Sequence, residues 1–210
     1  MTTNYQIHTN LKILKKYRQD EFPMTPLLHG VLSSENELES EPINTSKSNM
    51  YKYYVLDDNV DLEKLTDNFK TIINRHSVLK SIFIEKEVNG KKMLYCKPRG
   101  NDIDFEIEHY TKFNFTKFIR PFDLTKDILI RVGLVENKVL IIDMDHKVSD
   151  GYSFGILLNE LNKLYNGEPS EDLPIQFSDY AINYYENVLS DEFKDQINYY
   201  KSMLIVNINH

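Results

Sequence analysis

The sequence predicts an α+β fold, in which a mixed β-sheet has helices packed on it. Three observations lead to this prediction. Segments with the apolar period of an amphipathic helix are interspersed with short segments rich in β-branched and aromatic residues. Two pairs of the latter flank turn sequences, as in hairpins. No repeat, linker or low-complexity stretch divides the 210 residues, so one domain is expected.

The first fifty residues are mostly polar. Residues 1–21 have mixed charge and are expected to form an N-terminal extension. Residues 22–26 contain two prolines, and each fixes its own φ and disfavours helix at the residue before it. These residues therefore predict a rigid extended turn. A short helix over residues 27–32 and a polar surface loop over residues 33–49 follow.

The next segment predicts a strand, a helix and a hairpin. Residues 51–56 favour a strand, and Asp61 can cap a helix that runs to about Arg75. Residues 81–88 and 92–97 flank Asn89-Gly90, which is the strongest hairpin signal in the chain. The apolar face of the helix consists of Leu62, Leu65, Phe69, Ile72 and Ile73.

A second hairpin follows a further strand candidate at residues 105–110. Its strands are residues 128–135 and 139–144, and it turns at residues 136–138. Residues 139–142 are apolar without alternation, which predicts a strand that is covered on both faces.

The last part of the sequence predicts helices. The first begins at Ser153 and ends near Tyr165, with Asn166-Gly167 as its stop signal. A loop bounded by Pro169 and Pro174 leads to two more, at about residues 178–189 and 191–204.

Composition excludes several classes of function. A net charge of -7 argues against a general nucleic-acid binder, which usually has a basic face. No apolar run of about 18 residues is present, and the N-terminal residues lack the apolar core of a secretory signal, so no membrane association is expected. The single cysteine, Cys96, rules out an internal disulfide framework and fits the reducing cytoplasm.

A histidine at the end of the most apolar strand is the strongest candidate for chemistry. His146 follows residues 139–144, lies in a short loop and precedes Asp150-Gly151 and a predicted helix. The strand would fix its backbone while the loop exposes its ring. Because imidazole titrates near neutral pH, it can accept a proton from an amine or hydroxyl nucleophile. The pattern therefore favours a catalytic base at His146.

This segment resembles a known signature. Residues 146–151 match the end of His-His-x-x-x-Asp-Gly, which is shared by the condensation domains of nonribosomal peptide synthetases and by chloramphenicol acetyltransferase-like enzymes. His146 stands at the second, catalytic His of the signature, and Asp145 stands at the first. A lone match of this length is weak.

Further segments agree with the same family in the same order. With the His motif they cover about residues 20–204, and their spacing matches throughout, so the chain is identified as a member of the condensation-domain family. The segments are residues 22–31, similar to YPLTPMQEGM; residues 75–80, similar to RHxxLR with Lys80 at the second Arg; residues 121–131, similar to PFDLxxGPLLR; and residues 173–181, similar to LPxQYxDYA.

The resemblance implies a chloramphenicol acetyltransferase-like lobe. Residues 22–190 would be the N-terminal lobe of a condensation domain, and residues 191–210 the helix that leads toward a C-terminal lobe, which is absent from this chain. In the trimeric acetyltransferases the motif lies close to the C-terminus, whereas about 60 residues follow Gly151 here. In condensation domains the active site lies in a tunnel between the two lobes.

The resemblance also implies roles for the site residues. His146 would act as the base or position the acceptor amine. Asp150 would form a structural ion pair with Arg75, since a buried carboxylate requires a cation, and a proton-relay role is its alternative. Gly151 would supply either a positive φ or room for substrate, and its amide could equally face an oxyanion. Ser153 is expected to be a helix N-cap.

Asp145 is the departure from the family pattern. The first His of the signature mainly supports the loop, and a carboxylate in its place could raise the pKa of His146 and weaken it as a base. A loss of activity therefore stays open. Asp143, Asp145 and His146 could also be metal ligands, but we expect no metal because the two aspartates share a strand face that His146 does not. Cys96 is expected to be inert.

The implied reaction is attack of an acceptor amine on a donor thioester that is carried by phosphopantetheine. The expected partners are acyl or peptidyl carrier proteins and a C-terminal condensation lobe, with no nucleic acid, no membrane and no bound cofactor. Two alternatives stay open. One is a stand-alone acyltransferase that completes its site across an oligomer interface. The other is a non-catalytic remnant that binds a carrier protein or the missing lobe.

Overall fold

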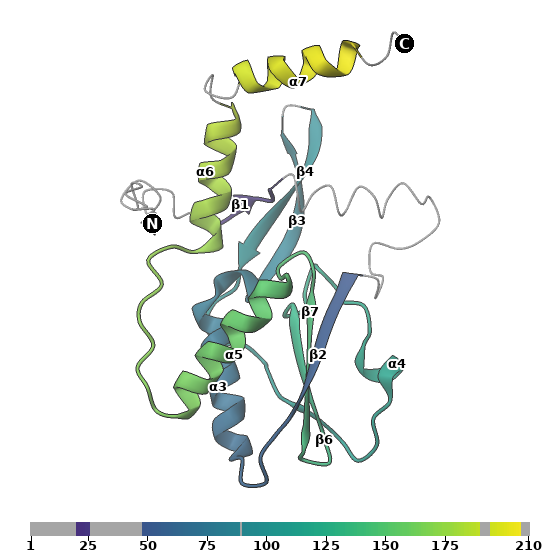
Figure 1. The fold of residues 1–210 in the computed structure, drawn as a ribbon, viewed down its shortest axis with the longest axis vertical. Coiled ribbons are helices and arrows are strands. Elements are labelled where there is room, and N and C mark those ends of the chain that lie inside the picture. Colours follow the sequence, from purple (N-terminus) through teal and green to yellow (C-terminus); the bar gives the residue numbers. More distant parts are fainter. Residues whose placement is uncertain (1–19, 26–47, 89, 190–193, 207–210) are drawn as a thin grey trace, which may run out of the picture.

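The computed structural model describes residues 20–25, 48–88, 90–189 and 194–206. Figure 1 shows two sheets arranged end to end, with helices packed around them. In chain order the elements are β1 (Phe22–Pro23), β2 (Asn49–Val55), α3 (Leu62–Arg75), the 3-10 helix η3 (Ser77–Lys80), β3 (Ser81–Val88), β4 (Lys91–Pro98), β5 (Glu108–Tyr110), α4 (Phe115–Phe118), β6 (Ile130–Val135), β7 (Val139–Asp145), α5 (Gly151–Tyr165), α6 (Phe177–Leu189) and α7 (Lys194–Val206).

The larger sheet has four strands in the order β2-β7-β6-β5. Its neighbours are antiparallel except β5 and β6, which are parallel, so the sheet is mixed as predicted. The hairpin between β6 and β7 turns where expected, with positive φ at Glu136 (49°) and Asn137 (54°). Such angles give the turn a twist that matches that of the strands. The predicted strand over residues 105–110 pairs only from Glu108 onward.

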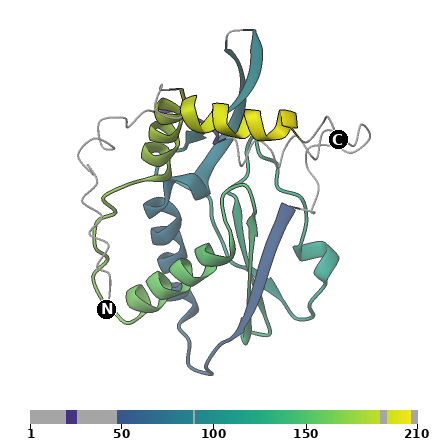
Figure 2. The ribbon, with the colours of Figure 1, turned by 45° about the horizontal axis from the view of Figure 1, so that its top comes forward.

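The central strand β7 is buried on both faces, as its apolar sequence predicted. α3 and α5 lie side by side on one face, where they pack on Leu140 and Ile142 (Figure 2). On the other face Ile141 packs against Phe118 and Ile119, which belong to or follow α4. Successive side chains along a strand point to opposite faces, so an uninterrupted apolar run serves two cores.

α3 follows its sequence signals closely. Asp61 caps it through a hydrogen bond from the Lys64 backbone N–H to Oδ1 (3.0 Å). A side-chain oxygen at this position satisfies a backbone donor that has no partner inside the helix. The predicted face of the helix is buried in the main core at Leu65, Phe69, Ile72 and Ile73.

The smaller sheet has three strands in the order β1-β4-β3. The hairpin of β3 and β4 turns with a positive φ of 73° at Gly90, as the sequence predicted. Residues 22–23, predicted as part of a turn, instead form an edge strand in which Phe22 pairs with Cys96. Proline is tolerated at Pro23 because an edge strand can do without its N–H.

The C-terminal helices α6 and α7 lie at the end of the molecule that carries the smaller sheet (Figure 1). α6 packs on β1 and buries Ala181 and Ile182 in a second core with Phe22 and Cys96. Burial raises the pKa of the Cys96 thiol to about 12, which keeps it protonated at neutral pH. The helix predicted at residues 27–32 falls outside the described residues. Among the helices that are described, none is both long and apolar enough to span a membrane.

Candidate functional site

The candidate site lies where β7 ends and α5 begins. Between β2 and β6, β7 is buried up to its last residue, Asp145, whereas His146 is exposed. Five residues after His146, α5 starts at Gly151. β7 thus passes through the core and ends there, and the loop that follows it exposes His146. This is the arrangement that the sequence predicted for His146.

Hydrogen bonds fix the loop on both sides of His146. Its backbone N–H donates to the carbonyl of Ser48, the residue before β2 (2.7 Å). The Lys147 N–H donates to Asp145 Oδ1 (2.8 Å), and the Ser149 hydroxyl donates to the Asp145 carbonyl (2.9 Å). A loop held by hydrogen bonds both to a neighbouring segment and within itself keeps its side chains in defined directions, as a catalytic group requires.

The imidazole of His146 is oriented by a backbone carbonyl. Nδ1 lies 2.8 Å from the carbonyl oxygen of Ser149. A carbonyl can only accept a hydrogen bond, so Nδ1 carries the proton. In the neutral ring the lone pair is therefore on Nε2, and the exposed ring can receive a proton there.

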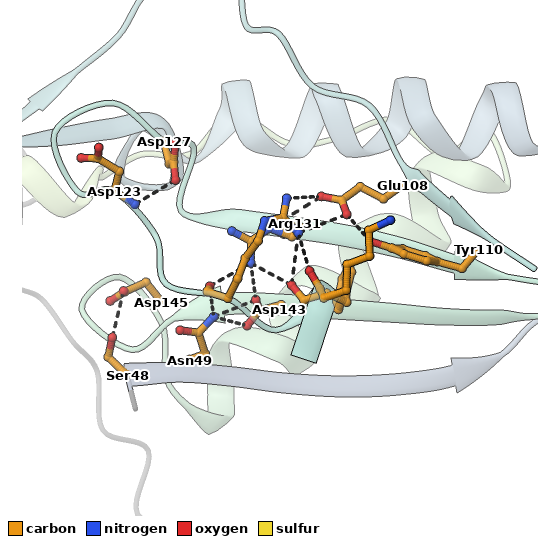
Figure 3. A network of polar contacts seen from close by, with 12 residues as sticks. Ser48, Asn49, Glu108, Tyr110, Asp123, Asp127, Arg131, Asp143 and Asp145 are labelled. Atoms are coloured by element: carbon orange, nitrogen blue, oxygen red, sulfur yellow. Dashed lines mark hydrogen bonds and ion pairs between the residues drawn. The ribbon is translucent and has the colours of Figure 1, made fainter. Parts of the chain in front are cut away.

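Asp145 faces into the protein. Its carboxylate accepts a hydrogen bond from the Ser48 hydroxyl to Oδ2 (3.1 Å; Figure 3), and Oδ1 lies 3.6 Å from Lys147 Nζ. Asp145 is 2% exposed and Lys147 is 1% exposed. The carboxylate expected to act on His146 is thus engaged with Ser48 and with the backbone and ammonium of Lys147.

The sequence prediction that Ser153 is the N-cap of the helix needs correction. The N-cap of α5 is Asp150 rather than Ser153, because the Ser153 N–H donates to Asp150 Oδ1 (2.9 Å). Ser153 is the reciprocal partner, and its Oγ accepts from the Asp150 N–H (3.0 Å). Together they form a capping box. The contacts of Ser153 lower the pKa of Asp150, chiefly through the hydroxyl hydrogen bond.

The ion pair predicted between Arg75 and Asp150 is also wrong. Arg75 Nε lies 3.3 Å from Oε1 of Glu160, well along α5 from its N-terminus. The other oxygen of Glu160 lies 2.8 Å from His76 Nε2. Asp150 needs no guanidinium, because it is exposed to solvent and its carboxylate is used by the capping box. The expected ion pair required a buried carboxylate, and the carboxylate of Asp150 is exposed.

Gly151 is the first residue of α5. Positive φ among the described glycines occurs at Gly90 and Gly167, so the positive φ proposed for Gly151 is wrong. A Cβ at this position would meet no atom within 4 Å. The space in front of Gly151 is open, which leaves the expectation of close substrate approach untested.

A buried polar network beneath the loop was missed by sequence reasoning (Figure 3). Arg131 of β6 pairs with Asp143 of β7, with Nη1 2.8 Å from Oδ2, and Asn49 donates to both oxygens of Asp143. Burial raises the pKa of Asp143 to about 6 in spite of these donors. Glu108 lies 3.7 Å from Arg131 Nε. The sequence did contain a signal for this pair. Arg131 and Asp143 are opposite charges that interrupt two apolar strands, and they lie directly opposite each other in the hairpin.

A small cavity of about 140 Å³ lies beside the loop. Its lining is mainly apolar and comes from α3, η3, β7, the loop and α5, with His76 and Ser153 as polar members. The loop contributes Val148 and α5 contributes Ile156. The cavity therefore offers an apolar space next to the segment that carries His146.

Comparison with known proteins gives one consistent family. The protein-family model of the condensation domain matches residues 19–208. Surfactin synthase subunit 1 of Bacillus subtilis (strain 168) is 35% identical over 144 residues, and gramicidin S synthase 2 of Aneurinibacillus migulanus is 33% identical over 162 residues. These matches cover 64% and 72% of this chain but 4% of each relative.

Solved structures show the same fold at low identity. The epimerization domain from the third module of tyrocidine synthetase B superposes with a TM-score of 0.69 at 19% identity. The starter condensation domain of rhizomide synthetase superposes with a TM-score of 0.70 at 10% identity. The matches cover 89% and 88% of this chain, and 45% and 48% of those chains, so this chain spans about half of each. The fold is that of a condensation-type lobe, and proteins with different reactions share it.

Proposed function

The chain belongs to the condensation-domain family, and we propose on that basis that it forms one wall of a site that joins a donor acyl group to an acceptor amine. The observation that carries the proposal is the contact between His146 Nδ1 and the Ser149 carbonyl, which leaves Nε2 as the proton acceptor of an exposed ring. The loop that carries His146 is held by the hydrogen bond from the His146 backbone N–H to the Ser48 carbonyl. Position and tautomer both suit a base.

The reaction would proceed by attack of the amine nitrogen on the thioester carbon. A C–N bond forms and the C–S bond breaks, while the proton lost by the amine passes to His146 Nε2 and then to the departing thiolate. Gly151, with open space in front of it, would let the reacting groups approach the start of α5. Asp145 and the Asp150–Ser153 capping box would hold the loop and helix in place.

The substrates would arrive on carrier proteins as phosphopantetheine thioesters, so no bound cofactor is required. Because the solved relatives have chains about twice the matched length, we infer that a second lobe closes the site from the other side. Held by one wall only, the reactants would lose positioning, which can supply roughly 7–11 kcal/mol of barrier lowering. The lone, buried Cys96 supports a cytoplasmic location.

A non-catalytic role in binding a carrier protein or the second lobe is the second candidate. The observation in its favour is Asp145, which replaces the first His of the signature. The two candidates differ in one respect: only the first requires His146 to exchange protons.

The test is a segment exchange. Residues 19–208 replace the matching segment of gramicidin S synthase 2, whose following residues are expected to supply the second lobe. The chimera and the isolated chain are mixed with loaded donor and acceptor carriers, and the amide is detected by mass spectrometry. We expect product from the chimera and none from the isolated chain. A folded chimera that binds carriers but forms no amide would support the binding role. Product from the isolated chain at the mass of a trimer would support a stand-alone acyltransferase.

A further inference from the structure

A polar pocket of about 370 Å³ lies on the opposite side of η3 from the cavity beside the His146 loop. Val78 and Leu79 of η3 line the cavity, whereas Ser77 and Lys80 line the pocket. The pocket is completed by the end of α3, the end of β4 with the loop after it, and the start of α6. This pocket is separate from the site proposed above.

Lys80 is a buried cation in this pocket with only neutral partners. The residue is 3% exposed. Its Nζ donates to Oδ1 of Asn74 (3.1 Å) and to Oδ1 of Asn101 (2.5 Å), and no carboxylate of the described residues pairs with it. Burial lowers its pKa. A buried charge is normally paired with an opposite charge, because amide dipoles compensate only part of the lost hydration.

Arg99 adds a second cation with spare donors. One of its terminal nitrogens, Nη2, donates to the Lys126 carbonyl, while its Nε is buried without a hydrogen-bond partner. A buried donor without a partner in a folded protein calls for an explanation such as a bound ion or water. The amide oxygens of Asn74 and Asn101 are used by Lys80, so the free polar groups of these side chains are N–H donors as well.

The remaining charges of the pocket leave it cationic. Arg75 is neutralised by Glu160, outside the pocket lining. The one carboxylate among the described lining residues is Asp20, which is exposed. Lys80 and Arg99 therefore outnumber the one acidic side chain of the lining.

We propose that this pocket binds a small phosphoryl oxyanion, held by Lys80 and Arg99. A phosphoryl group offers several acceptor oxygens around one centre, which suits an ammonium, a guanidinium and amide N–H groups that share one pocket. The bound anion supplies the charge that Lys80 lacks and ties η3 to the segment after β4. Because η3 also forms a wall of the cavity near His146, binding stabilises that wall.

The experiment measures the affinity of the folded chain by calorimetric titration with inorganic phosphate, at constant ionic strength set by chloride. A second arm uses free 4′-phosphopantetheine, which distinguishes a free ion from a phosphoryl group on a carrier arm. We expect saturable binding of inorganic phosphate. Tight binding of phosphopantetheine alone would assign the pocket to the carrier arm and overturn the free-ion form of the proposal.

Two variants with opposite expected effects on phosphate affinity test the roles of Lys80 and Asp20. Lys80→Met should weaken phosphate binding at least tenfold, and Asp20→Asn, which removes the carboxylate at the rim, should strengthen it. Lys163→Gln, an exposed lysine on α5, is the matched control and should change nothing. If Lys80→Met fails to fold, the Asp20→Asn result still decides. The absence of saturable phosphate binding, or equal binding by wild type and both variants, would overturn the proposal.

Discussion

Arg75 at the end of α3 and Glu160 in α5 form an ion pair, with Nε 3.3 Å from Oε1. His76, which follows α3, binds the other carboxylate oxygen through Nε2 at 2.8 Å. One carboxylate of α5 thus holds the two residues that lead into η3. The link fixes α5 relative to α3 next to the cavity beside the His146 loop.

We predict that Arg75 and Glu160 are energetically coupled. Arg75→Ala and Glu160→Ala should each lower the free energy of unfolding by about 1–3 kcal/mol, because each removes the same ion pair from a poorly hydrated position. The double variant should lose less than their sum by about 1 kcal/mol, because the ion pair can be lost only once. Denaturant melts of the four proteins measure this. The control pair Lys138–Asp58, with side chains 60% and 85% exposed, should show a coupling near zero. Additivity at Arg75 and Glu160 would contradict the prediction.

The sequence predicted local structure better than long-range polar partners. Asp61 as an N-cap, Asn89-Gly90 as a turn and the doubly buried β7 depend on neighbouring residues and on apolar pattern, and the structure agrees at Asp61, Gly90 and β7. The partner of Arg75 depends instead on where α5 crosses α3, which no local pattern encodes. A motif match pointed to Asp150, but the crossing brings Glu160 to Arg75.

At the candidate site, too, features set by local sequence were predicted and detailed polar contacts were not. The exposure of His146 followed from a strand that ends and a helix that begins, and the structure agrees. The contact between His146 Nδ1 and the Ser149 carbonyl could not be predicted from the sequence, because this contact depends on the exact conformation of the loop. The Arg131–Asp143 pair is detectable in hindsight, since register follows from the hairpin turn at residues 136–138.

The capping box of α5 should contribute to stability in a pH-dependent way. Asp150→Ala should lower the free energy of unfolding by about 1 kcal/mol at pH 7. Since folding lowers the pKa of Asp150 below its ordinary value of 3.8, this contribution is present above that value and is lost as the pH falls through the folded pKa. Thermal melts from pH 7 to pH 2.5 should show the gap to wild type closing. Asp150→Asn, which can still cap, should stay near wild type at pH 7, and a gap that widens in acid would refute the assignment.

Gly133 in β6 is predicted to be required by packing. A Cβ there would lie 2.5 Å from Cε2 of Phe118, whose ring is fully buried, so the ring would have to move. Gly133→Ala should therefore lower the free energy of unfolding by about 1–3 kcal/mol. Gly155→Ala in α5 is the matched control, since its Cβ meets no atom within 4 Å, and it should raise stability by about 0.5–1 kcal/mol. The same sign for both substitutions in urea melts would disprove the packing argument.

The proposed base is tested by His146→Ala in the segment-exchange chimera. The ring is exposed and contacts one backbone carbonyl, so its removal should leave the melting temperature nearly unchanged. Loss of a general base typically costs 10²–10⁴-fold in rate, and we expect a loss of that size in amide formation under single-turnover conditions. His109→Ala is the control, because His109 is an exposed histidine of β5 outside the site and should keep full activity. Amide formation at a near-normal rate by a folded His146→Ala chimera would remove the catalytic role. It would leave His146 as a loop residue, and the second lobe would then have to supply the proton acceptor.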